Sequence, residues 1–270
     1  MSIKDYSKYF DKNTSPSNHA PFFPKNIFAI IAGSTGCGKT NLLFNFLFEE
    51  GYLDYGQVYF YSSTLHQEGY KMAMRFYNEM ENDVYEKTRK YIQIAHFLDI
   101  NDDDDDDEDD DDKTKAKGKK KSKKKGKKKS KIIDPKELDP KISHVMVFDD
   151  VMLNDQTKIK EYFCRGRHNN VNIFYLCQSL HKIAKHCIRE NANVFILFHQ
   201  DDKTLEYFHK THISGDMNFK EFKAFCDGAW TKKHGFVVIN IWEESHLGRY
   251  ISNYENIYIP TKYIKIQQNT

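Results

Sequence analysis

Short apolar runs alternate along this chain with longer segments in which apolar residues recur every three or four positions. The short runs predict buried β-strands, whereas the three-to-four spacing is typical of helices that bury one face. The run at 91–97 alternates between apolar and polar residues, which favours an edge strand. The predicted strands are 27–32, 58–63, 91–97, 144–150, 171–178 and 193–199.

Helices are predicted between these strands wherever the apolar spacing allows them. The clearest case follows the strand 171–178, where one helical face would consist of Leu180, Ile183, Ala184, Cys187 and Ile188. Gly166 is predicted to end the helix that precedes the same strand. The predicted helices are 41–48, 67–81, 155–164, 180–188, 202–210 and 218–226.

The order of these elements predicts the α/β class, with a mostly parallel sheet flanked by helices on both faces. A terminal β segment is expected at 235–242, paired with 249–252. The polar, proline-containing residues 1–25 predict an extended N-terminal arm. Residues 26–270 are then expected to form one domain, interrupted by an insert at 101–131.

The insert carries an extreme charge pattern. Residues 102–112 are eleven consecutive acidic residues, and 113–131 contain thirteen lysines, so the two blocks nearly cancel within a net charge of only +2. Because the insert has almost no apolar residues, it is predicted to be disordered. Its lysines would bind a phosphate backbone or act as a nuclear localisation signal, or else the two blocks neutralise each other in a solvated loop.

Cysteine usage and hydropathy place the protein inside a cell. The five cysteines stand in no metal-ligand or disulfide spacing, which is typical of reduced thiols in an intracellular protein. The sequence has no apolar run that approaches the length of a membrane span, and residues 1–5 lack the apolar core of a signal peptide. We therefore expect a soluble, non-secreted protein without a membrane partner.

The segment Gly33–Thr40 fits the P-loop pattern G-x-x-x-x-G-K-[ST], and it lies between a predicted strand and a predicted helix as that motif requires. Backbone N–H groups of such a loop bind phosphate, with help from the helix dipole. Lys39 would reach the β- and γ-phosphates of ATP, and the Thr40 hydroxyl would ligate Mg²⁺. The predicted nucleotide contacts are Gly33, Ser34, Thr35, Gly36, Cys37, Gly38, Lys39, Thr40 and Asn41.

Polar side chains end the two strands that follow. Asp149 and Asp150 come directly after an apolar run, in the form of a Walker-B strand, and Gln178 ends the next strand. Parallel strands place such residues at one edge of the sheet. Asp149 would hold Mg²⁺ through water, Asp150 would polarise the attacking water, and Gln178 would orient that water against the γ-phosphate. The structural alternatives are an acidic turn and a polar strand end.

Arg165 and Arg167 precede the strand that ends at Gln178. Either would serve as an arginine finger that stabilises phosphoryl transfer in a neighbouring subunit. The alternative is a solvated helix C-terminus, where the helix dipole favours arginine in any case.

Together, these segments resemble the FtsK–HerA superfamily, and within it the DNA-packaging ATPases of large eukaryotic DNA viruses and of Polinton-like or adintovirus-like elements. The similarity covers most of the chain outside the arm and the insert. It is carried by Gly33–Thr40, Val145–Asp150, Arg165–Asn170, Gln178, Leu53–Tyr55, Ser63–Gln67, Phe148–Met152, Ile188–Asn191 and His234–Val238.

The resemblance implies an ASCE/RecA-like P-loop fold and a homo-oligomeric ring motor that uses ATP and Mg²⁺ to thread double-stranded DNA into a preformed viral capsid. It implies the roles stated above for Lys39, Thr40, Asp149, Asp150 and Gln178, and a finger at Arg165 or Arg167. It also implies a location in the host cytoplasm, the nucleus or a viral factory, or association with the virion. The insert, and Asp150 where glutamate is common, depart from the family pattern.

Two other functions remain open from the residues alone. A P-loop kinase of a small molecule needs an arginine-bearing lid, and no arginine-rich lid is evident in the sequence. A nucleotide-regulated binding module would have no use for Asp150 and Gln178, which suit hydrolysis.

Overall fold

The computed structural model describes residues 19–100 and 132–267. Its described residues form a sheet of nine strands in the order β3-β2-β4-β5-β1-β6-β7-β8-β9. The six strands from β3 to β6 are mutually parallel, and β7, β8 and β9 extend the sheet in antiparallel fashion. The strands are β1 (Phe28–Ala32), β2 (Gln57–Ser62), β3 (Ala95–Asp99), β4 (His144–Asp149), β5 (Val171–Cys177), β6 (Val194–Phe198), β7 (Phe236–Asn240), β8 (Tyr250–Ser252) and β9 (Asn256–Tyr258).

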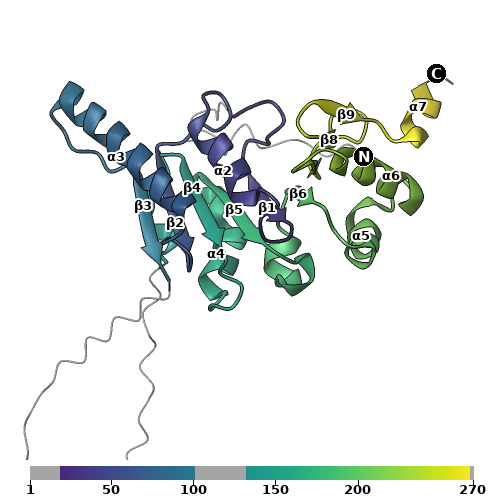
Figure 1. Ribbon diagram of the computed structural model, residues 1–270, viewed down its shortest axis with the longest axis horizontal. Coiled ribbons are helices and arrows are strands. Elements are labelled where there is room, and N and C mark those ends of the chain that lie inside the picture. The colour runs from purple at the N-terminus through teal and green to yellow at the C-terminus, as the bar shows by residue number, and fades with distance from the viewer. Residues whose placement is uncertain (1–18, 101–131, 268–270) are drawn as a thin grey trace, which may run out of the picture.

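The strands at the middle of the sheet are buried along their whole length, as expected for parallel strands covered on both faces. Helices α2 (Lys39–Phe48) and α3 (Glu68–Thr88) pack on one face, and α4 (Thr157–Arg165), α5 (Asp202–Phe208) and α6 (Phe219–Trp230) pack on the other (Figure 1). Successive residues of β1 divide accordingly, since Ala29 and Ile31 face the first group and Phe28 and Ile30 face the second. A last helix, α7 (Thr261–Gln267), follows β9. The α/β prediction is therefore confirmed.

The helix predicted at 180–188 is wrong. The chain forms a 3₁₀ turn at Leu180–Lys182 and a π turn at Lys185–Arg189, and between them Ile183 and Ala184 are extended, with ψ angles of 141° and 116°. The apolar residues of the predicted face still point inward, since Leu180, Ile183 and Ile188 are buried. A short helix depends on tertiary packing for its stability. The apolar spacing therefore records which side chains are buried, but not the backbone conformation that buries them.

Several boundaries also differ from the prediction. Helix α3, predicted at 67–81, extends to Thr88, and the edge strand lies at Ala95–Asp99 instead of 91–97. The buried Glu81 of α3 accepts hydrogen bonds from the N–H groups of Ile94 and Ala95, at 2.7 and 3.1 Å. This contact between helix and strand, which is invisible in the local sequence, sets where β3 begins.

Helix α4 ends next to Gly166 as predicted, but Gly166 keeps a right-handed backbone with a φ of −58°. The chain continues as a 3₁₀ turn to Asn169 and reverses at Asn170, which has a φ of 53°. Asparagine tolerates this left-handed conformation better than most residues. The terminal β segment, in contrast, pairs as predicted, with Val237 opposite Ser252 and Ile239 opposite Tyr250.

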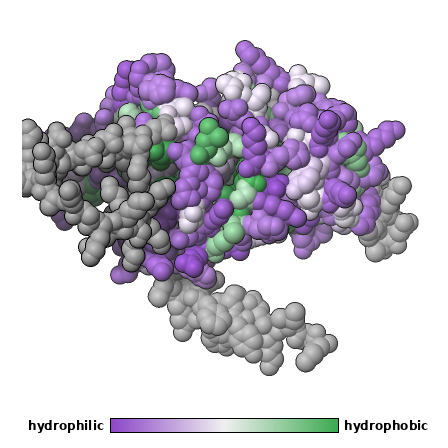
Figure 2. Space-filling model, turned by 90° about the horizontal axis from the view of Figure 1, so that it is seen from below, coloured by the Kyte–Doolittle hydropathy of each residue, from purple (hydrophilic) through white to green (hydrophobic). Residues whose placement is uncertain are grey.

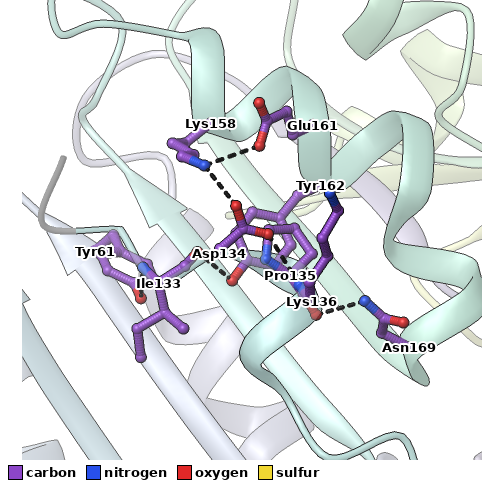
Figure 3. A network of polar contacts seen from close by, with 9 residues as sticks. All are labelled: Tyr61, Ile133, Asp134, Pro135, Lys136, Lys158, Glu161, Tyr162 and Asn169. Atoms are coloured by element: carbon purple, nitrogen blue, oxygen red, sulfur yellow. Dashed lines mark hydrogen bonds and ion pairs between the residues drawn. The ribbon is translucent and has the colours of Figure 1, made fainter. Parts of the chain in front are cut away.

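The residues on either side of the insert are hydrogen-bonded to the sheet. Ile100 donates its N–H to the carbonyl of Ser62 at 3.4 Å, and Ile133 donates to the Tyr61 hydroxyl at 3.2 Å. Figure 3 shows the segment that follows the insert, where Tyr162 donates to the Ile133 carbonyl at 2.9 Å and Lys158 pairs with Asp134 at 2.8 Å. The prediction of disorder falls on 101–131, outside the described residues.

The described part of the predicted arm is packed against the domain. Ala20 and Phe23 are buried, and the Phe23 ring contacts those of Phe46 and Phe174 at centroid distances of 5.2 and 6.2 Å. All five cysteines are free thiols. Within 19–100 and 132–267, the helices lack the combination of length and hydrophobicity needed to cross a membrane.

Candidate nucleotide-binding site

The predicted P-loop connects the carboxyl end of β1 to the first turn of α2. Gly36 and Gly38 have φ angles of 77° and 112°, a region that side chains with a Cβ rarely adopt, so glycine is required at both positions. Gly38 is the residue that caps α2, which begins at Lys39. The loop therefore closes directly onto a helix N-terminus, where N–H groups are free to bind an anion.

A pocket opens between this loop and the carboxyl ends of β2, β4 and β5. Its walls are formed by Thr35, Gly36, Lys39, Thr40, Thr64, Gln67, Asp149, Asp150, Met152, Leu176, Cys177 and Gln178. The view from below in Figure 2, which looks toward this edge of the parallel strands, shows a mainly hydrophilic face with a small apolar group near its middle. Of the predicted nucleotide contacts, Asn41 is exposed on the first turn of α2, and Gly33, Ser34, Cys37 and Gly38 complete the loop.

Lys39 directs its ammonium group into the loop. The Nζ atom donates to the carbonyl oxygens of Gly33 and Ser34 at 2.8 and 2.9 Å. The positive charge therefore lies at the concave side of the loop, beside Thr40 on the pocket wall.

Strand register explains why residues so distant in sequence meet here. Ala32 at the end of β1 is paired with Cys177, and Leu176 is paired with Asp149. Because β5 lies between β1 and β4, Gln178 is placed between the P-loop and the acidic pair. The sheet thus brings together all the predicted P-loop, acidic and glutamine residues that line the pocket.

Asp149 is a buried carboxylate. Burial raises its pKa, while a hydrogen bond from Tyr70 and the charge of Lys39 act in the opposite direction. The Tyr70 hydroxyl donates to Asp149 Oδ2 at 2.6 Å. The carboxylate is therefore held by α3 as well as by its own strand.

Asp150 is exposed and adopts a left-handed backbone with a φ of 55°. Its carbonyl oxygen accepts a hydrogen bond from the Ser63 hydroxyl at 2.9 Å. A non-glycine residue in this conformation costs some backbone energy, and such residues concentrate at functional sites. The turn separates the two neighbouring carboxylates, leaving Asp149 buried and Asp150 open to the pocket.

Sequence reasoning missed four residues of this site. Thr64 and Gln67, from the loop after β2, line the pocket, and Tyr70 follows on α3. His234, whose backbone φ is 61°, lies with Nδ1 3.0 Å from the carbonyl oxygen of Cys37 in the P-loop. For Thr64, Gln67 and His234, the available signal was the family resemblance of the stretches Ser63–Gln67 and His234–Val238, which named no role for them. Tyr70 lies outside both stretches.

The predicted arginines lie elsewhere. Arg165 is the last residue of α4 and Arg167 lies in the turn between α4 and β5, so both are at the amino edge of the parallel strands, opposite the pocket. The Arg167 guanidinium packs on the rings of Phe28 and Trp242, 5.1 and 4.6 Å from their centroids, and donates to the Asn191 carbonyl at 3.2 Å. Since strands advance about 3.3 Å per residue, neither arginine reaches the P-loop of its own chain.

The pocket is suited to Mg²⁺. Thr40 and Asp149 line it together and offer a hydroxyl and a carboxylate, the oxygen ligands that Mg²⁺ prefers. In the described part of the chain there is no group of three or more histidine, cysteine or acidic residues that would hold a metal by itself. This donor set fits an ion that takes few protein ligands and shares its remaining positions with water and phosphate.

Comparison with known proteins yields weak similarities. No protein-family model matches the chain, and no curated protein does. The genome packaging NTPase B204 from Sulfolobus turreted icosahedral virus 2, in complex with AMP, is 11% identical over 87% of this chain and 97% of that one, with a TM-score of 0.47. Its complex with ATP-gammaS is 11% identical over 80% and 92%, with a TM-score of 0.43.

The DNA-packaging ATPase B204 from Sulfolobus turreted icosahedral virus is 11% identical over 81% of this chain and 93% of that one, with a TM-score of 0.41. TM-scores below 0.5 at such identities establish neither a shared fold nor a shared function. The functional assignment therefore rests on the residues of this chain.

Proposed function

We propose that this protein is an Mg²⁺-dependent ATP hydrolase that drives double-stranded DNA into a viral or virus-like capsid. The observation that carries the hydrolase assignment is the meeting of the P-loop, the Asp149–Asp150 pair and Gln178 around one pocket. Each group comes from a different strand, and one edge of the sheet presents them all.

The residues divide the chemistry among them. Backbone N–H groups of Gly33–Thr40 and the Lys39 ammonium bind and orient the phosphates, while Thr40 and Asp149 would hold the metal ion. Bound Mg²⁺ would neutralise charge on the phosphate oxygens. Asp150, the exposed carboxylate, accepts a hydrogen bond from the attacking water and draws its proton away. Gln178, between the two groups, aligns that water and responds to loss of the γ-phosphate.

The DNA-packaging part of the proposal rests on the sequence resemblance, which also implies the ASCE/RecA-like subclass, the homo-oligomeric ring and the capsid partner. Two of the segments that carry it, Arg165–Asn170 and Ile188–Asn191, are in contact through Arg167 and Asn191. Arginines at the edge opposite the pocket suit a ring in which one subunit completes the site of the next. The corresponding location is the host cytoplasm, the nucleus or a viral factory, or the virion itself.

ATP turnover by the full chain, measured with and without double-stranded DNA, tests the proposal. We expect turnover that DNA stimulates, and Lys39→Ala should reduce it by about 10²–10³-fold because a preorganised phosphate-binding cation is lost. Lys71→Ala is the matched control, since Lys71 is an exposed lysine paired with Glu68 on α3.

The other candidate functions give different results in the same assay. A kinase would turn over only with a small-molecule phosphate acceptor, and a nucleotide-regulated binding module would bind ATP with little turnover. DNA-independent turnover would leave a hydrolase but contradict the translocase. Normal turnover in Lys39→Ala would contradict the assignment of the site.

A further inference from the structure

Tyr70 lies at the junction between α3 and the acidic strand β4. Its side chain is buried, with 1% of its surface exposed, and its hydroxyl donates to Asp149 Oδ2 at 2.6 Å. The ring is held edge-on by Phe44 and Phe60, at centroid distances of 5.7 and 5.9 Å. Aromatic packing therefore leaves the hydroxyl in one position, directed at the carboxylate.

Strand register brings β2 to the same point. Ser62, the last residue of β2, is paired with Asp149 of β4, and its side chain lies near the Tyr70 hydroxyl. The Tyr70 hydroxyl thus joins α3 to β4 where the parallel strands end. A buried carboxylate needs such a donor, because an unsatisfied polar group in the interior is costly.

We propose that Tyr70 is a positioning residue that holds the Asp149 carboxylate in the orientation needed to bind the Mg²⁺–nucleotide complex. The inference rests on the proposed function, in which Asp149 holds the metal. With Oδ2 bonded to Tyr70, rotation of the carboxylate is blocked, and Oδ1 is the oxygen left for the metal and its water. Partners of this kind, which orient a ligand without touching the metal, commonly change metal affinity by about 10–100-fold.

A purely structural role in the core is the competing explanation, and α3 supplies a matched control for it. Tyr77 lies two turns further along the same helix and is also 1% exposed. Its hydroxyl hydrogen-bonds to that of Tyr55 at 2.7 Å, away from the pocket. Tyr70→Phe and Tyr77→Phe therefore each remove one buried hydroxyl from the same helix, but only the first disturbs Asp149.

The test uses the full chain as wild type, Tyr70→Phe, Tyr77→Phe, Asp149→Asn and the Tyr70→Phe/Asp149→Asn double variant. Mn²⁺ replaces Mg²⁺ as a probe, and its binding in the presence of a non-hydrolysable ATP analogue is followed by loss of the free-ion electron paramagnetic resonance signal. Analogue affinity in EDTA and thermal melting are measured in parallel. These readouts do not depend on turnover.

We expect Tyr70→Phe to weaken Mn²⁺ binding by about 10-fold. Analogue affinity in EDTA should be unchanged, because the P-loop contacts are intact. Tyr77→Phe should bind Mn²⁺ as the wild type does, even where its melting temperature falls. In the Asp149→Asn background, Tyr70→Phe should cause no further loss, since it acts through that carboxylate.

Three outcomes would each overturn the inference. Tyr70→Phe could bind Mn²⁺ as tightly as the wild type, or Tyr77→Phe could lose as much Mn²⁺ affinity as Tyr70→Phe. The third is that Tyr70→Phe lowers Mn²⁺ affinity in the Asp149→Asn background as much as it does in the wild type. If Tyr70→Phe does not fold, Phe44→Leu loosens the ring contact that fixes Tyr70, and unchanged Mn²⁺ affinity there would overturn the inference too. Failure of the wild type to bind the analogue at all would instead contradict the proposed function, so the two failures are distinguishable.

Discussion

At the scale of single residues, Asp149 and Asp150 are neighbours in sequence with opposite surroundings. Asp149 is 9% exposed and bonded to Tyr70, whereas Asp150 is exposed on a left-handed turn. Burial raises the pKa of Asp149, and the hydrogen bond from Tyr70, followed by the charge of Lys39, opposes this rise. This contrast supports one carboxylate for the metal and another for water.

Asp150→Asn should abolish most turnover while leaving nucleotide binding intact. General-base groups contribute about 10²–10⁴-fold in rate, and asparagine keeps both the size of the side chain and its tolerance of a positive φ. Turnover and analogue affinity are measured side by side, with Asp227→Asn on α6 as an exposed control. Normal turnover in Asp150→Asn would place the base elsewhere.

At the scale of secondary-structure elements, helix α5 continues into a π turn at His209–Ile213. His212 in this turn lies against the rings of Phe195 and Phe208, both at a centroid distance of 4.9 Å. Burial, and then the nearby charge of Arg189, lower the pKa of His212 to about 4 from an ordinary value of 6.5. The π turn thus keeps a half-buried, neutral histidine against the core.

This turn should make folding stability depend on pH. Between pH 6.5 and 4 the unfolded chain binds a proton at His212 more readily than the folded protein does, so the free energy of unfolding falls as the pH falls through that window. Above pH 6.5, His212 is neutral in both the folded and the unfolded chain, so no stability is lost there. When the pH is lowered from 7 to 5, the melting temperature of His212→Phe should therefore fall less than that of the wild type.

Other histidines with lowered pKa values, His19, His96 and His144, remain in both proteins and cancel from the comparison. His186→Gln, at a histidine that is 82% exposed, is the control and should follow the wild type. Parallel melting curves for His212→Phe and the wild type across this range would show that His212 does not titrate as described.

At the scale of the whole molecule, the nucleotide pocket and the Arg165–Asn170 segment occupy opposite edges of the sheet. Both arginines are exposed, but Arg167 is engaged by Phe28, Trp242 and Asn191 of its own chain. If the chain forms a ring, Arg165 is the better placed of the two to enter the site of a neighbour.

Arg165→Ala should assemble and bind ATP but hydrolyse it about 10³–10⁵-fold more slowly, as expected for the loss of an arginine finger. Arg167→Ala should instead lower stability by roughly 0.5–1 kcal/mol through lost contacts with the aromatic rings. Mixing Arg165→Ala with Lys39→Ala subunits should restore part of the activity, because the second supplies an intact arginine to the competent pocket of the first. Mixed rings without any recovery would contradict a finger in trans.

Deleting 102–131 should leave folding and basal ATP turnover nearly unchanged, because a segment with almost no apolar residues contributes no core. The flanking residues Ile100 and Ile133 both bond to the end of β2, so the shortened loop joins points already held by the same strand. Circular dichroism and turnover measure the effect.

Extending that deletion through Asp134 provides the contrast. It removes the Tyr162–Ile133 hydrogen bond and the Lys158–Asp134 ion pair, so the melting temperature should fall. A large loss of helix content in the shorter deletion would mean that the insert is structural.

Features that depend on neighbouring residues in the chain could be predicted from the sequence. The P-loop needs eight consecutive residues between a strand and a helix, and Gly36 and Gly38 have the positive φ angles that the motif demands. Asp149 and Gln178 could be placed because a parallel sheet gathers the ends of its strands at one edge. Apolar periodicity likewise predicted the α/β class and the terminal β pairing.

Contacts between distant segments were decided only by the tertiary structure. Tyr70 looked like any apolar residue of an amphipathic helix, and its bond to Asp149 depends on how α3 packs over β4. The segment from Leu180 onward has a helical pattern of apolar residues, but its backbone forms two separate turns that bury Leu180, Ile183 and Ile188. The edge on which Arg165 lies follows from the path of α4 across the sheet. Sequence periodicity records which side of an element is buried, whereas the partner that buries it is set by packing over the whole chain.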